Sequence, residues 1–369
     1  MEKKDRAWIE INLDNLEHNI KEIQRILSSK TKIMAVVKAN AYGHGMIEIS
    51  KKLNEIGIRD FAVATLKEAI TLKKHHIIGN ILVLGYTKIE DIPLILKYDL
   101  IQTVIDEEYA KQLLSILSKQ KVKVHIKINT GMNRIGIHYH NIEMIKSLYY
   151  SHNLQVLGIF SHLCVADSNA LEDRNFTQNQ IELFNHVVEQ LKEAKIEVGK
   201  VHLQSSYGLL NYPTLQYDYV RTGIIMYGVH SELNIKMKVS ISLKPVLTLK
   251  AKVTSVKEIM SNETVGYGRK YKATKKEKIA SISIGYADGY PRSISNQGAK
   301  VLINKQYAGV IGRICMDQCM IKVTGMNIKV GDTVTIIGNN PNISAEKLAF
   351  YAGTITTELL SRLGERLEK

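Results

Sequence analysis

The first residue that could do chemistry is a lysine in an unusual setting. Lys38 ends the apolar run IMAVVK, and a glycine-rich turn with Tyr42 and a histidine follows it in the stretch AVVKANAYGHG. A lysine that a rigid strand holds away from water can lose its proton and form a Schiff base with an aldehyde. Exposure to solvent would explain the position equally well, so this lysine alone marks only a candidate site.

Further polar residues follow later apolar runs, again at their carboxyl ends. They are Lys127 with Arg134 after it, His162, Ser205 with Ser206, and Arg221 with Gly223 and Ile224. Polar residues with a purely structural role would occur at both ends of the predicted strands. Their clustering at the carboxyl ends therefore indicates a functional site at that face of the fold. Hydroxyls and backbone N–H groups after late strands can hold a phosphate. An aldehyde-binding lysine beside a phosphate cradle suggests pyridoxal phosphate, while aldolase or other phosphate chemistry stays open.

Eight short apolar runs position these residues. The segments between them are mostly amphipathic with helical spacing, such as MIEISKKLNEIG, which stops at Gly57. Runs that are apolar throughout suit strands buried on both faces. Eight β/α units in about 220 residues match a closed (β/α)₈ barrel, and a doubly wound open sheet is the alternative. The predicted strands are IMAVVK, 60–65, 80–85, 100–105, 122–129, 154–161, 200–206 and a run around 219–228.

The pattern changes beyond about Ile235. The segments PVLTLKAKVTSVKEI, KIASISIGYAD and DTVTIIG read as strands separated by Gly and Asn turns. Residues Ser344 to Ala352 predict a short helix with Ser344 as its N-cap. We therefore predict two domains, with residues 1–235 forming the barrel that binds the cofactor and residues 236–369 forming a mainly β domain.

Composition argues against several classes of function. The formal net charge is +14, but the lysines are dispersed and no nucleic-acid-binding motif occurs, so we predict no nucleic-acid partner. Cys164, Cys315 and Cys319 lack the spacing of a zinc site or a disulfide framework, which predicts no metal and a reducing, cytoplasmic environment. No signal peptide and no apolar run of about 18 residues is visible, so we expect no membrane segment in this chain. A membrane-anchored parent, of which this chain is the cytoplasmic domain, stays open.

Several motifs together resemble those of the alanine racemases and their serine-racemase relatives. AVVKANAYGHG is similar to the family's cofactor-lysine motif, and KINTGMNRIG, VRTGIIMYG, VGYGRKY, IGYADGYPR and GRICMDQCM follow in the family's order. The resemblance covers essentially the whole chain. It implies a (β/α)₈ barrel followed by a β domain, and an enzyme that interconverts L- and D-amino acids with pyridoxal 5'-phosphate. The D-amino acids of this family supply precursors of cell-wall peptidoglycan.

By this resemblance two residues would act as bases. Lys38 would hold the cofactor and act on the D side of the substrate. Tyr267, in VGYG, would act on the L side and come from the other subunit of a homodimer. Racemisation needs two bases because one face of the carbon loses a proton while the other gains one, and general bases work best with a pKa near the working pH. Without the motif, Tyr267 would be interpreted as an ordinary buried tyrosine with a bonded hydroxyl.

The resemblance also assigns residues to the cofactor. Arg221 would donate to the pyridine nitrogen, and His162 would support Arg221 from behind. Because a guanidinium does not readily give up a proton, the ring nitrogen would stay unprotonated. The cofactor's phosphate would be held by Tyr42, Ser206, Gly223 and Ile224.

Other residues would meet the substrate. Arg134 would face its carboxylate, and a carbamylated Lys127 would orient Arg134 through the negative charge that the modification adds. An unmodified Lys127 would instead need an acidic neighbour. Met316 and Asp317 would approach from the partner subunit, Met316 through its backbone.

Thr357, in GTITTELLSRLG, departs from the family pattern. The family usually has a tyrosine there that binds the phosphate and borders the substrate side chain. Asn129 and Ser205 also replace a usual Asp and a usual Asn. Serine racemases linked to vancomycin resistance resemble this chain in having a smaller polar residue at the threonine position. A smaller residue leaves room for the hydroxyl of serine. A pocket that merely accepts this hydroxyl distinguishes serine from alanine by roughly 10²-fold or less, whereas a hydrogen bond from Thr357 to the hydroxyl would distinguish them more strongly. We therefore predict activity on alanine and on serine.

Three alternatives compete with this prediction. A strict alanine racemase differs only in substrate preference. A non-catalytic carrier of pyridoxal phosphate would be a barrel alone, so the β domain and Tyr267 argue against it. An amino-acid decarboxylase of the related barrel-plus-β class would carry a glycine-rich phosphate loop and a catalytic cysteine in a pattern that this sequence lacks.

Overall fold

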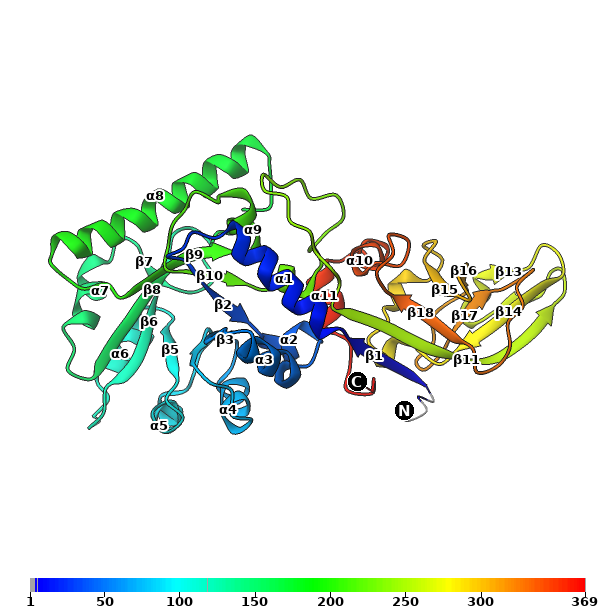
Figure 1. Ribbon diagram of the computed structural model, residues 1–369, viewed down its shortest axis with the longest axis horizontal. Coiled ribbons are helices and arrows are strands. Elements are labelled where there is room, and N and C mark those ends of the chain that lie inside the picture. Colours follow the sequence, from blue (N-terminus) through cyan, green and yellow to red (C-terminus); the bar gives the residue numbers. More distant parts are fainter. Residues whose placement is uncertain (1–3, 5, 118, 369) are drawn as a thin grey trace.

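The computed structural model describes residues 4, 6–117 and 119–368, and it consists of a barrel and a separate β-rich part (Figure 1). The barrel, on the left of the view, contains most of the first two thirds of the chain. The β-rich part, on the right, contains most of the remainder. This arrangement confirms the predicted fold class.

Eight parallel strands form the barrel: β2 (Lys32–Val36), β3 (Asp60–Val63), β4 (Asn80–Val83), β5 (Ile101–Val104), β6 (Val122–Asn129), β8 (Leu154–Phe160), β9 (Lys200–Ser205) and β10 (Tyr219–Thr222). Neighbours in this order pair with one another, and β10 pairs with β2 to close the circle. The predicted barrel is therefore confirmed, and the open sheet is excluded. A two-residue strand, β7 (Ile137–His138), pairs with the end of β6.

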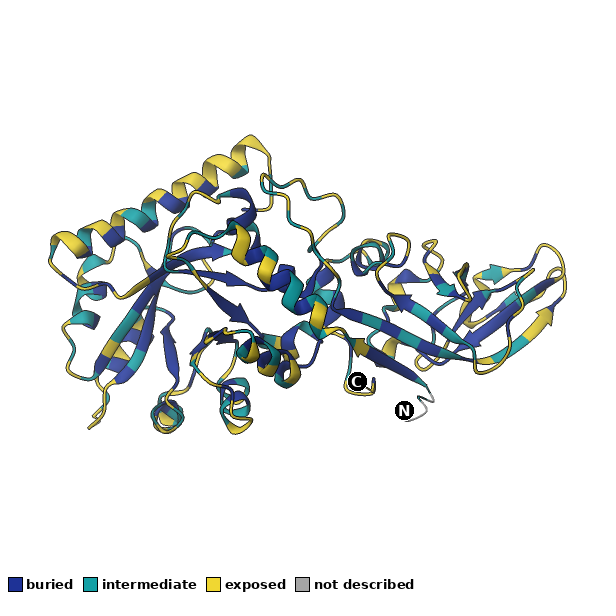
Figure 2. Cartoon of the chain, viewed as in Figure 1, coloured by how far each residue is buried: buried dark blue, intermediate teal, exposed yellow. Residues whose placement is uncertain are grey.

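Amphipathic helices cover the outside of the barrel: α1 (Leu13–Ile26), α3 (Met46–Glu55), α4 (Leu66–Lys74), α5 (Ile92–Lys97), α6 (Glu107–Leu114), α7 (Ile142–Tyr149) and α8 (Leu171–Glu193). Helix α8 buries Phe184, Val187 and Leu191 along one side and exposes the other side to solvent (Figure 2). Burying such an apolar stripe is the main source of stability for a surface helix. At the start of α6 the Asp106 carboxylate accepts the Tyr109 N–H at 2.7 Å and so caps the helix.

An antiparallel sheet forms the β-rich part: β1 (Ala7–Ile11), β11 (Leu247–Ile259), β14 (Glu277–Ile282), β17 (Cys319–Lys322), β16 (Gln306–Ile311), β15 (Lys300–Ile303) and β18 (Thr333–Ile337), in this order. Strand β18 also pairs with β11, so six of the strands close on themselves. A ribbon of β12 (Thr264–Val265) and β13 (Tyr271–Lys272) follows β11 in the chain. The predicted helix is α10 (Ala345–Ala352), and the Ser344 hydroxyl caps it by accepting the Lys347 N–H.

Two segments lie across the predicted division at residue 235. Strand β1 belongs to the sheet of the β-rich part, where Ala7 pairs with Ala251, so assigning all of residues 1–235 to the barrel was wrong for this strand. The pairing covers the edge of β11, and it buries Ala7, Trp8 and Ile9. Helix α11 (Thr356–Ser361) packs in the other direction, against the barrel segment α2 (Lys38–Tyr42).

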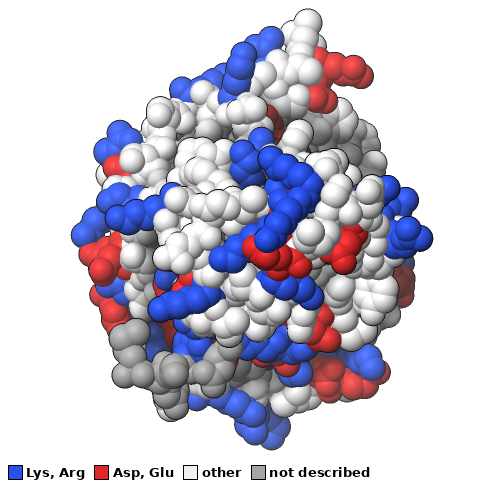
Figure 3. All heavy atoms as spheres, turned by 90° about the vertical axis from the view of Figure 1, so that its right-hand side faces the viewer, with Lys and Arg blue, Asp and Glu red and all other residues white. Residues whose placement is uncertain are grey.

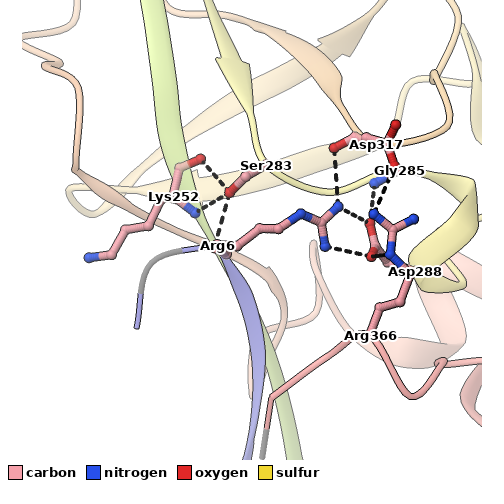
Figure 4. Close-up of polar contacts among 7 residues, drawn as sticks. All are labelled: Arg6, Lys252, Ser283, Gly285, Asp288, Asp317 and Arg366. Atoms are coloured by element: carbon pink, nitrogen blue, oxygen red, sulfur yellow. Dashed lines mark hydrogen bonds and ion pairs between the residues drawn. The ribbon is translucent and has the colours of Figure 1, made fainter. Parts of the chain in front are cut away.

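A buried carboxylate joins both ends of the chain to the β-rich part (Figure 4). Both oxygens of Asp288 accept from Arg6, at 2.6 and 2.7 Å, and the Gly285 N–H donates at 2.9 Å. Arg366, near the other end, lies 3.6 Å from Asp288 and donates to Asp317 at 2.8 Å. Breaking the ion pair with Asp288 would leave a buried charge without its partner, which is costly. Arg366, which lies next to Asp288, also binds Asp317, so the loop that carries Asp317 is tied to this buried cluster.

The face of the molecule at the β-rich end carries both signs of charge. Basic side chains lie between acidic and uncharged ones across this face, as the dispersed charges of the sequence predict (Figure 3). Among the helices of the described residues, none combines the length and apolar character that crossing a bilayer requires.

Candidate active site

A cavity of about 430 Å³ opens at the carboxyl ends of the barrel strands. Its walls include Val36 at the end of β2, Ala64 just after β3 and Gly85 just after β4. This is the face at which barrels of this kind build active sites. Eleven residues that the sequence singles out line this one cavity: Lys38, Tyr42, Lys127, Arg134, His162, Ser205, Ser206, Arg221, Gly223, Ile224 and Thr357.

The backbone after β2 turns with the left hand and so brings Lys38 and Tyr42 to the same cavity. Residues Ala39 to Tyr42 all have φ between 52 and 54°. Left-handed helical backbone costs about 1–2 kcal/mol per residue outside glycine, and such strain is typical of functional sites. Side-chain oxygens fix the turn, because Glu68 accepts the Ala39 N–H at 2.7 Å and Asn40 accepts the Met46 N–H at 2.8 Å.

The environment of Lys38 shifts its amine toward the neutral form. Burial lowers the pKa of Lys38, and the positive charge of Arg134 at the same cavity lowers it further. Glu68 acts in the opposite direction and offsets part of this effect. A neutral amine is the form that attacks a carbonyl carbon or accepts a proton, so both chemical roles expected of Lys38 are open to it.

A small polar pocket lies next to Lys38 at the ends of β9 and β10. Ser206 begins α9 (Ser206–Asn211), and its hydroxyl accepts the N–H of Gly223 at 3.2 Å. Gly223 precedes the 3₁₀ turn of Ile224–Tyr227. A Cβ on Gly223 would lie only 2.7 Å from the phenol oxygen of Tyr42, so glycine keeps this space open. Burial raises the pKa of Tyr42 to about 12, and its phenol therefore stays a hydrogen-bond donor.

Arg221 is buried without a carboxylate partner in the described residues. It donates to the carbonyl oxygens of Ser161 and Leu203 at 2.7 and 2.9 Å. It also contacts Nδ1 of His162 at 3.1 Å and Nδ1 of His202 at 2.9 Å. Burial lowers the pKa of Arg221 to about 9, which still leaves it cationic at neutral pH. Because a guanidinium has only donors, both histidine Nδ1 atoms must accept, and this fixes their tautomers.

The hydrogen bonds of Arg221 continue into the barrel interior through two histidines that sequence reasoning missed. His202 Nε2 lies 2.9 Å from Nδ1 of His125, on the strand β6. Burial is the main cause that lowers the pKa of both rings, and Arg221 lowers each further. In the sequence both residues stand inside apolar strand runs, where a histidine is easily taken for part of the core. Their common feature is a buried position three to four residues before the strand end.

Lys127 is 3% exposed and has no acidic partner among the described residues. Its Nζ donates to the Ile128 carbonyl at 2.6 Å and to the Ser161 hydroxyl at 3.3 Å. Burial lowers the pKa of Lys127 to about 7, and Arg221 and Arg134 contribute to the shift. An ammonium next to two guanidinium groups is unfavourable, so the site favours a lysine that is neutral or carries a negative modification.

Tyr267, Met316 and Asp317 lie away from this cavity, on the β-rich part. Tyr267 follows β12 and is 70% exposed, so the interpretation as an ordinary buried tyrosine was wrong. It borders a separate hollow of about 450 Å³. Met316 is 53% exposed, and Asp317 pairs with Arg366. Within one chain these three residues do not join the group around Lys38.

Two family models match the chain. The N-terminal domain of alanine racemase matches residues 11–231, and its C-terminal domain matches residues 246–369. An amino-acid racemase of Enterococcus faecalis is 43% identical over 98% of this chain and 51% of its own length. The chain thus spans about half the length of that relative. An alanine racemase of Clostridium novyi is 38% identical over 98% of this chain and 94% of its own.

Solved structures agree with these matches. An alanine racemase of Clostridium difficile 630 superposes with a TM-score of 0.91 at 36% identity, covering 98% of this chain and 94% of that one. An alanine racemase of Bacillus anthracis with bound L-Ala-P superposes with a TM-score of 0.90 at 32% identity, covering 99% and 94%. The chain therefore belongs to the alanine racemase family.

Proposed function

We propose that this chain is a pyridoxal-phosphate-dependent racemase that interconverts the L and D forms of alanine and of serine. The observation that carries the proposal is Lys38, whose pKa is lowered at a cavity that also contains Arg134 and the polar pocket of Ser206 and Gly223. The matching relatives named as racemases support the reaction class. Because the Enterococcus relative is about twice as long, the activity of a whole protein containing this chain belongs to the same proposal.

The cavity fits pyridoxal phosphate, the cofactor on which this family depends. Lys38 would hold its aldehyde carbon, and Arg221 would face its ring nitrogen. The space that Gly223 leaves open beside the Tyr42 phenol suits a phosphate. The phosphate would take donors from Tyr42, Ser206, Gly223 and Ile224. When bound, the cofactor withdraws electrons from the α-carbon of an amino acid and so makes its proton more acidic.

Arg221 would control how far that withdrawal goes. Its guanidinium donates a hydrogen bond without transferring a proton, even with the pKa lowered to about 9. A ring nitrogen that stays unprotonated accepts less charge, which favours returning a proton to the α-carbon over transamination. His162 and the two carbonyl oxygens that contact Arg221 hold it in this orientation.

The second base would come from a partner subunit in a homodimer. Lys38 would take or return the proton on the D side, and the partner's Tyr267 would do so on the L side. The exposure of Tyr267 on the β-rich part, away from the cavity of its own chain, supports this arrangement. Met316 and Asp317 lie on the same part of the chain and would approach the substrate carboxylate with it.

Arg134 would bind the substrate carboxylate from within the chain. We also propose that Lys127 is carbamylated. A lowered pKa supplies the neutral amine that reaction with carbon dioxide needs, and the resulting negative charge would lie between Arg221 and Arg134. This would resolve the unfavourable packing of a third cation into the site and would orient Arg134.

Thr357 is the reason to include serine. It lines the cavity at the start of α11, where a tyrosine is usual in the family. The smaller threonine would leave room for the hydroxyl of serine, and its own hydroxyl would form a hydrogen bond to that group. A strict alanine racemase is the second candidate.

The β-rich part, with its exposed Tyr267, argues against a non-catalytic cofactor carrier. The three cysteines are free thiols, which suits the reducing cytoplasm that we propose for this chemistry.

The test is to measure the racemisation of L-alanine and of L-serine by the purified, cofactor-loaded chain. Turnover of both substrates is expected. Turnover of alanine alone would select the strict alanine racemase, and turnover of neither, with the cofactor bound, would select the carrier.

A further inference from the structure

Tyr207 lines the same cavity as Thr357, although no role is assigned to it above. It is the second residue of α9, directly after Ser206. Its phenol faces Ser231, a residue in the stretch that leads out of the barrel. The Ser231 N–H and the Ser231 hydroxyl both bond the phenol oxygen at 2.6 Å. These short contacts tie the residue after the phosphate pocket to a second segment.

Ser231 passes the connection on to the helix that carries Thr357. Its carbonyl oxygen accepts the Thr356 N–H at 2.7 Å. Thr356 is fully buried and opens α11, whose N-cap residue Ile355 makes no side-chain cap. The Ser231 carbonyl therefore satisfies one of the N–H groups that a helix start leaves without an intrahelical partner. We call Tyr207, Ser231 and Thr356 the α11 anchor.

A second contact holds α11 against the barrel near the other end of the helix. Gly43, directly after α2, has φ +83°, and a Cβ there would lie 2.2 Å from the carbonyl oxygen of Leu360. The backbone of α11 thus packs directly on the turn that carries Lys38 and Tyr42. With one contact at Thr356 and another at Leu360, the helix has little freedom to shift, and the position of Thr357 in the cavity wall is set.

We infer that Tyr207 is a positioning residue for substrate choice, which acts by setting how far Thr357 reaches toward the substrate side chain. This inference rests on the proposed racemase function. A hydrogen bond to the hydroxyl of serine needs its partner within a few tenths of an ångström, whereas the methyl group of alanine makes no such demand. Loosening the α11 anchor should therefore affect serine more than alanine.

The experiment compares Tyr207→Phe with the wild type on L-alanine, L-serine and L-2-aminobutyrate, using cofactor-loaded protein. The substitution keeps the ring in the cavity wall and removes the phenol that binds Ser231. We expect kcat/KM for serine to fall about tenfold relative to alanine, with little change in the ratio of 2-aminobutyrate to alanine. Ser231→Ala, which removes one of the two bonds to the phenol, should change the serine ratio in the same direction by less.

Tyr217→Phe is the matched control. It also removes a phenol hydrogen bond, to Asn185 at 2.7 Å, but Tyr217 does not line the cavity. It should leave all substrate ratios unchanged even if it lowers the melting temperature. The absorption band of the bound cofactor and its loss on dialysis are recorded for each variant, because they do not depend on turnover.

The outcomes separate this inference from the proposed function. If the wild type racemises none of the three amino acids, the proposed function fails. If the wild type is active and Tyr207→Phe lowers all substrates equally, Tyr207 is merely structural and the inference is wrong. If Tyr207→Phe loses cofactor while its substrate ratios stay unchanged, the phenol is a cofactor contact, and the inference is wrong as well. Should Tyr207→Phe fail to fold, the serine ratio of Ser231→Ala decides.

Discussion

Residues from the motifs of the alanine racemase family lie in two regions of this chain, the cavity of the barrel and the exposed face of the β-rich part. The two regions are opposite in burial. Lys127 and Arg221 are 3% and 4% exposed, and burial lowers the pKa of both. Tyr267 and Met316 are 70% and 53% exposed on the other part of the molecule. The first group is complete within one chain, whereas the second group faces outward. The difference supports our proposal that one chain builds half of a site and presents the other half to a second copy.

Part of the exposed group is tied to buried residues of the β-rich part. The loop of Met316 and Asp317 is held by Arg366 and by Arg6, both of which also contact the buried Asp288 (Figure 4). The Ala287 N–H donates to the Met316 carbonyl oxygen at 3.0 Å. A loop that is already held in place would lose less conformational freedom on binding a partner, which suits the proposed role of this loop at a subunit interface.

Removing the amine of Lys38 should have the largest effect. Lys38→Ala is expected to lose the absorption band of lysine-bound cofactor and to lower racemisation by at least about 10³-fold in both directions. Lys97→Ala, on the outer helix α5, is the matched control and should behave as the wild type. A Lys38→Ala variant with an unchanged spectrum would contradict the cofactor assignment.

Tyr267→Phe should come next, with an effect on racemisation in both directions. The barrel half of the site stays intact, so the cofactor band should persist. Racemisation should fall by about 10²- to 10³-fold from either enantiomer, because the group that handles the proton on the L side is missing, whereas exchange of the α-proton of the D enantiomer with solvent, which needs only Lys38, should continue. Tyr307→Phe, on the same part of the molecule and 36% exposed, is the control. Full activity from the L enantiomer in Tyr267→Phe would remove this residue from the reaction.

Thr357→Tyr tests the substrate preference of the barrel half. The larger side chain takes the space proposed for the hydroxyl of serine, so the ratio of serine to alanine turnover should fall by about tenfold or more. Thr354→Tyr, outside the cavity and two residues before α11, controls for added bulk. A constant ratio in Thr357→Tyr would remove the argument for serine.

Lys127 should produce the smallest effect, seen in stability against pH. For an unmodified lysine, the pKa falls from 10.5 to about 7 on folding. Between these values the unfolded chain binds the proton and the folded chain does not, so the free energy of unfolding rises with pH. Lys127→Met should lose this rise, seen as a few degrees in Tm.

A carbamylated Lys127 adds a dependence on carbon dioxide. The folded site would hold the carbamate, whereas the unfolded chain releases carbon dioxide and regains a free amine, so bicarbonate should stabilise the folded wild type. Our proposal predicts that the wild-type Tm falls when carbon dioxide is removed at constant pH and that the Tm of Lys127→Met does not change. A wild-type Tm that does not respond to bicarbonate would contradict carbamylation.

Much of this architecture can be predicted from the sequence. Strands buried on both faces have apolar sequences, and the polar residues that follow these strands lie at one face of the barrel, so ten residues that line the cavity can be found from the strand pattern alone. Thr357 follows no such strand, and only the family resemblance points to it. The β-rich part is also visible, because its residue pattern changes near Ile235. In each case the signal is local, since a short stretch of sequence contains it.

The features that escape prediction depend on distant or inward contacts. Strand β1 pairs with β11 about 240 residues later, as Ala7 with Ala251, and no local pattern records that choice. The left-handed turn after Lys38 uses Ala and Asn instead of glycine. His202 belongs to an apolar run, and its hydrogen bond to Arg221 depends on how β9 and β10 pair. The proposed role of Tyr207 depends on its hydrogen bonds to Ser231 and on the contact of Ser231 with Thr356, which is distant in the sequence.

The most direct test of the central claim mixes two inactive variants, Lys38→Ala and Tyr267→Phe, under conditions that let subunits exchange. If each site combines Lys38 of one chain with Tyr267 of its partner, a mixed dimer has one intact site and one doubly defective site. Random pairing should then restore roughly a quarter of the wild-type activity, because half of the dimers are mixed. Activity that stays at the level of the separate variants, despite verified exchange, would show that the two halves do not meet between subunits.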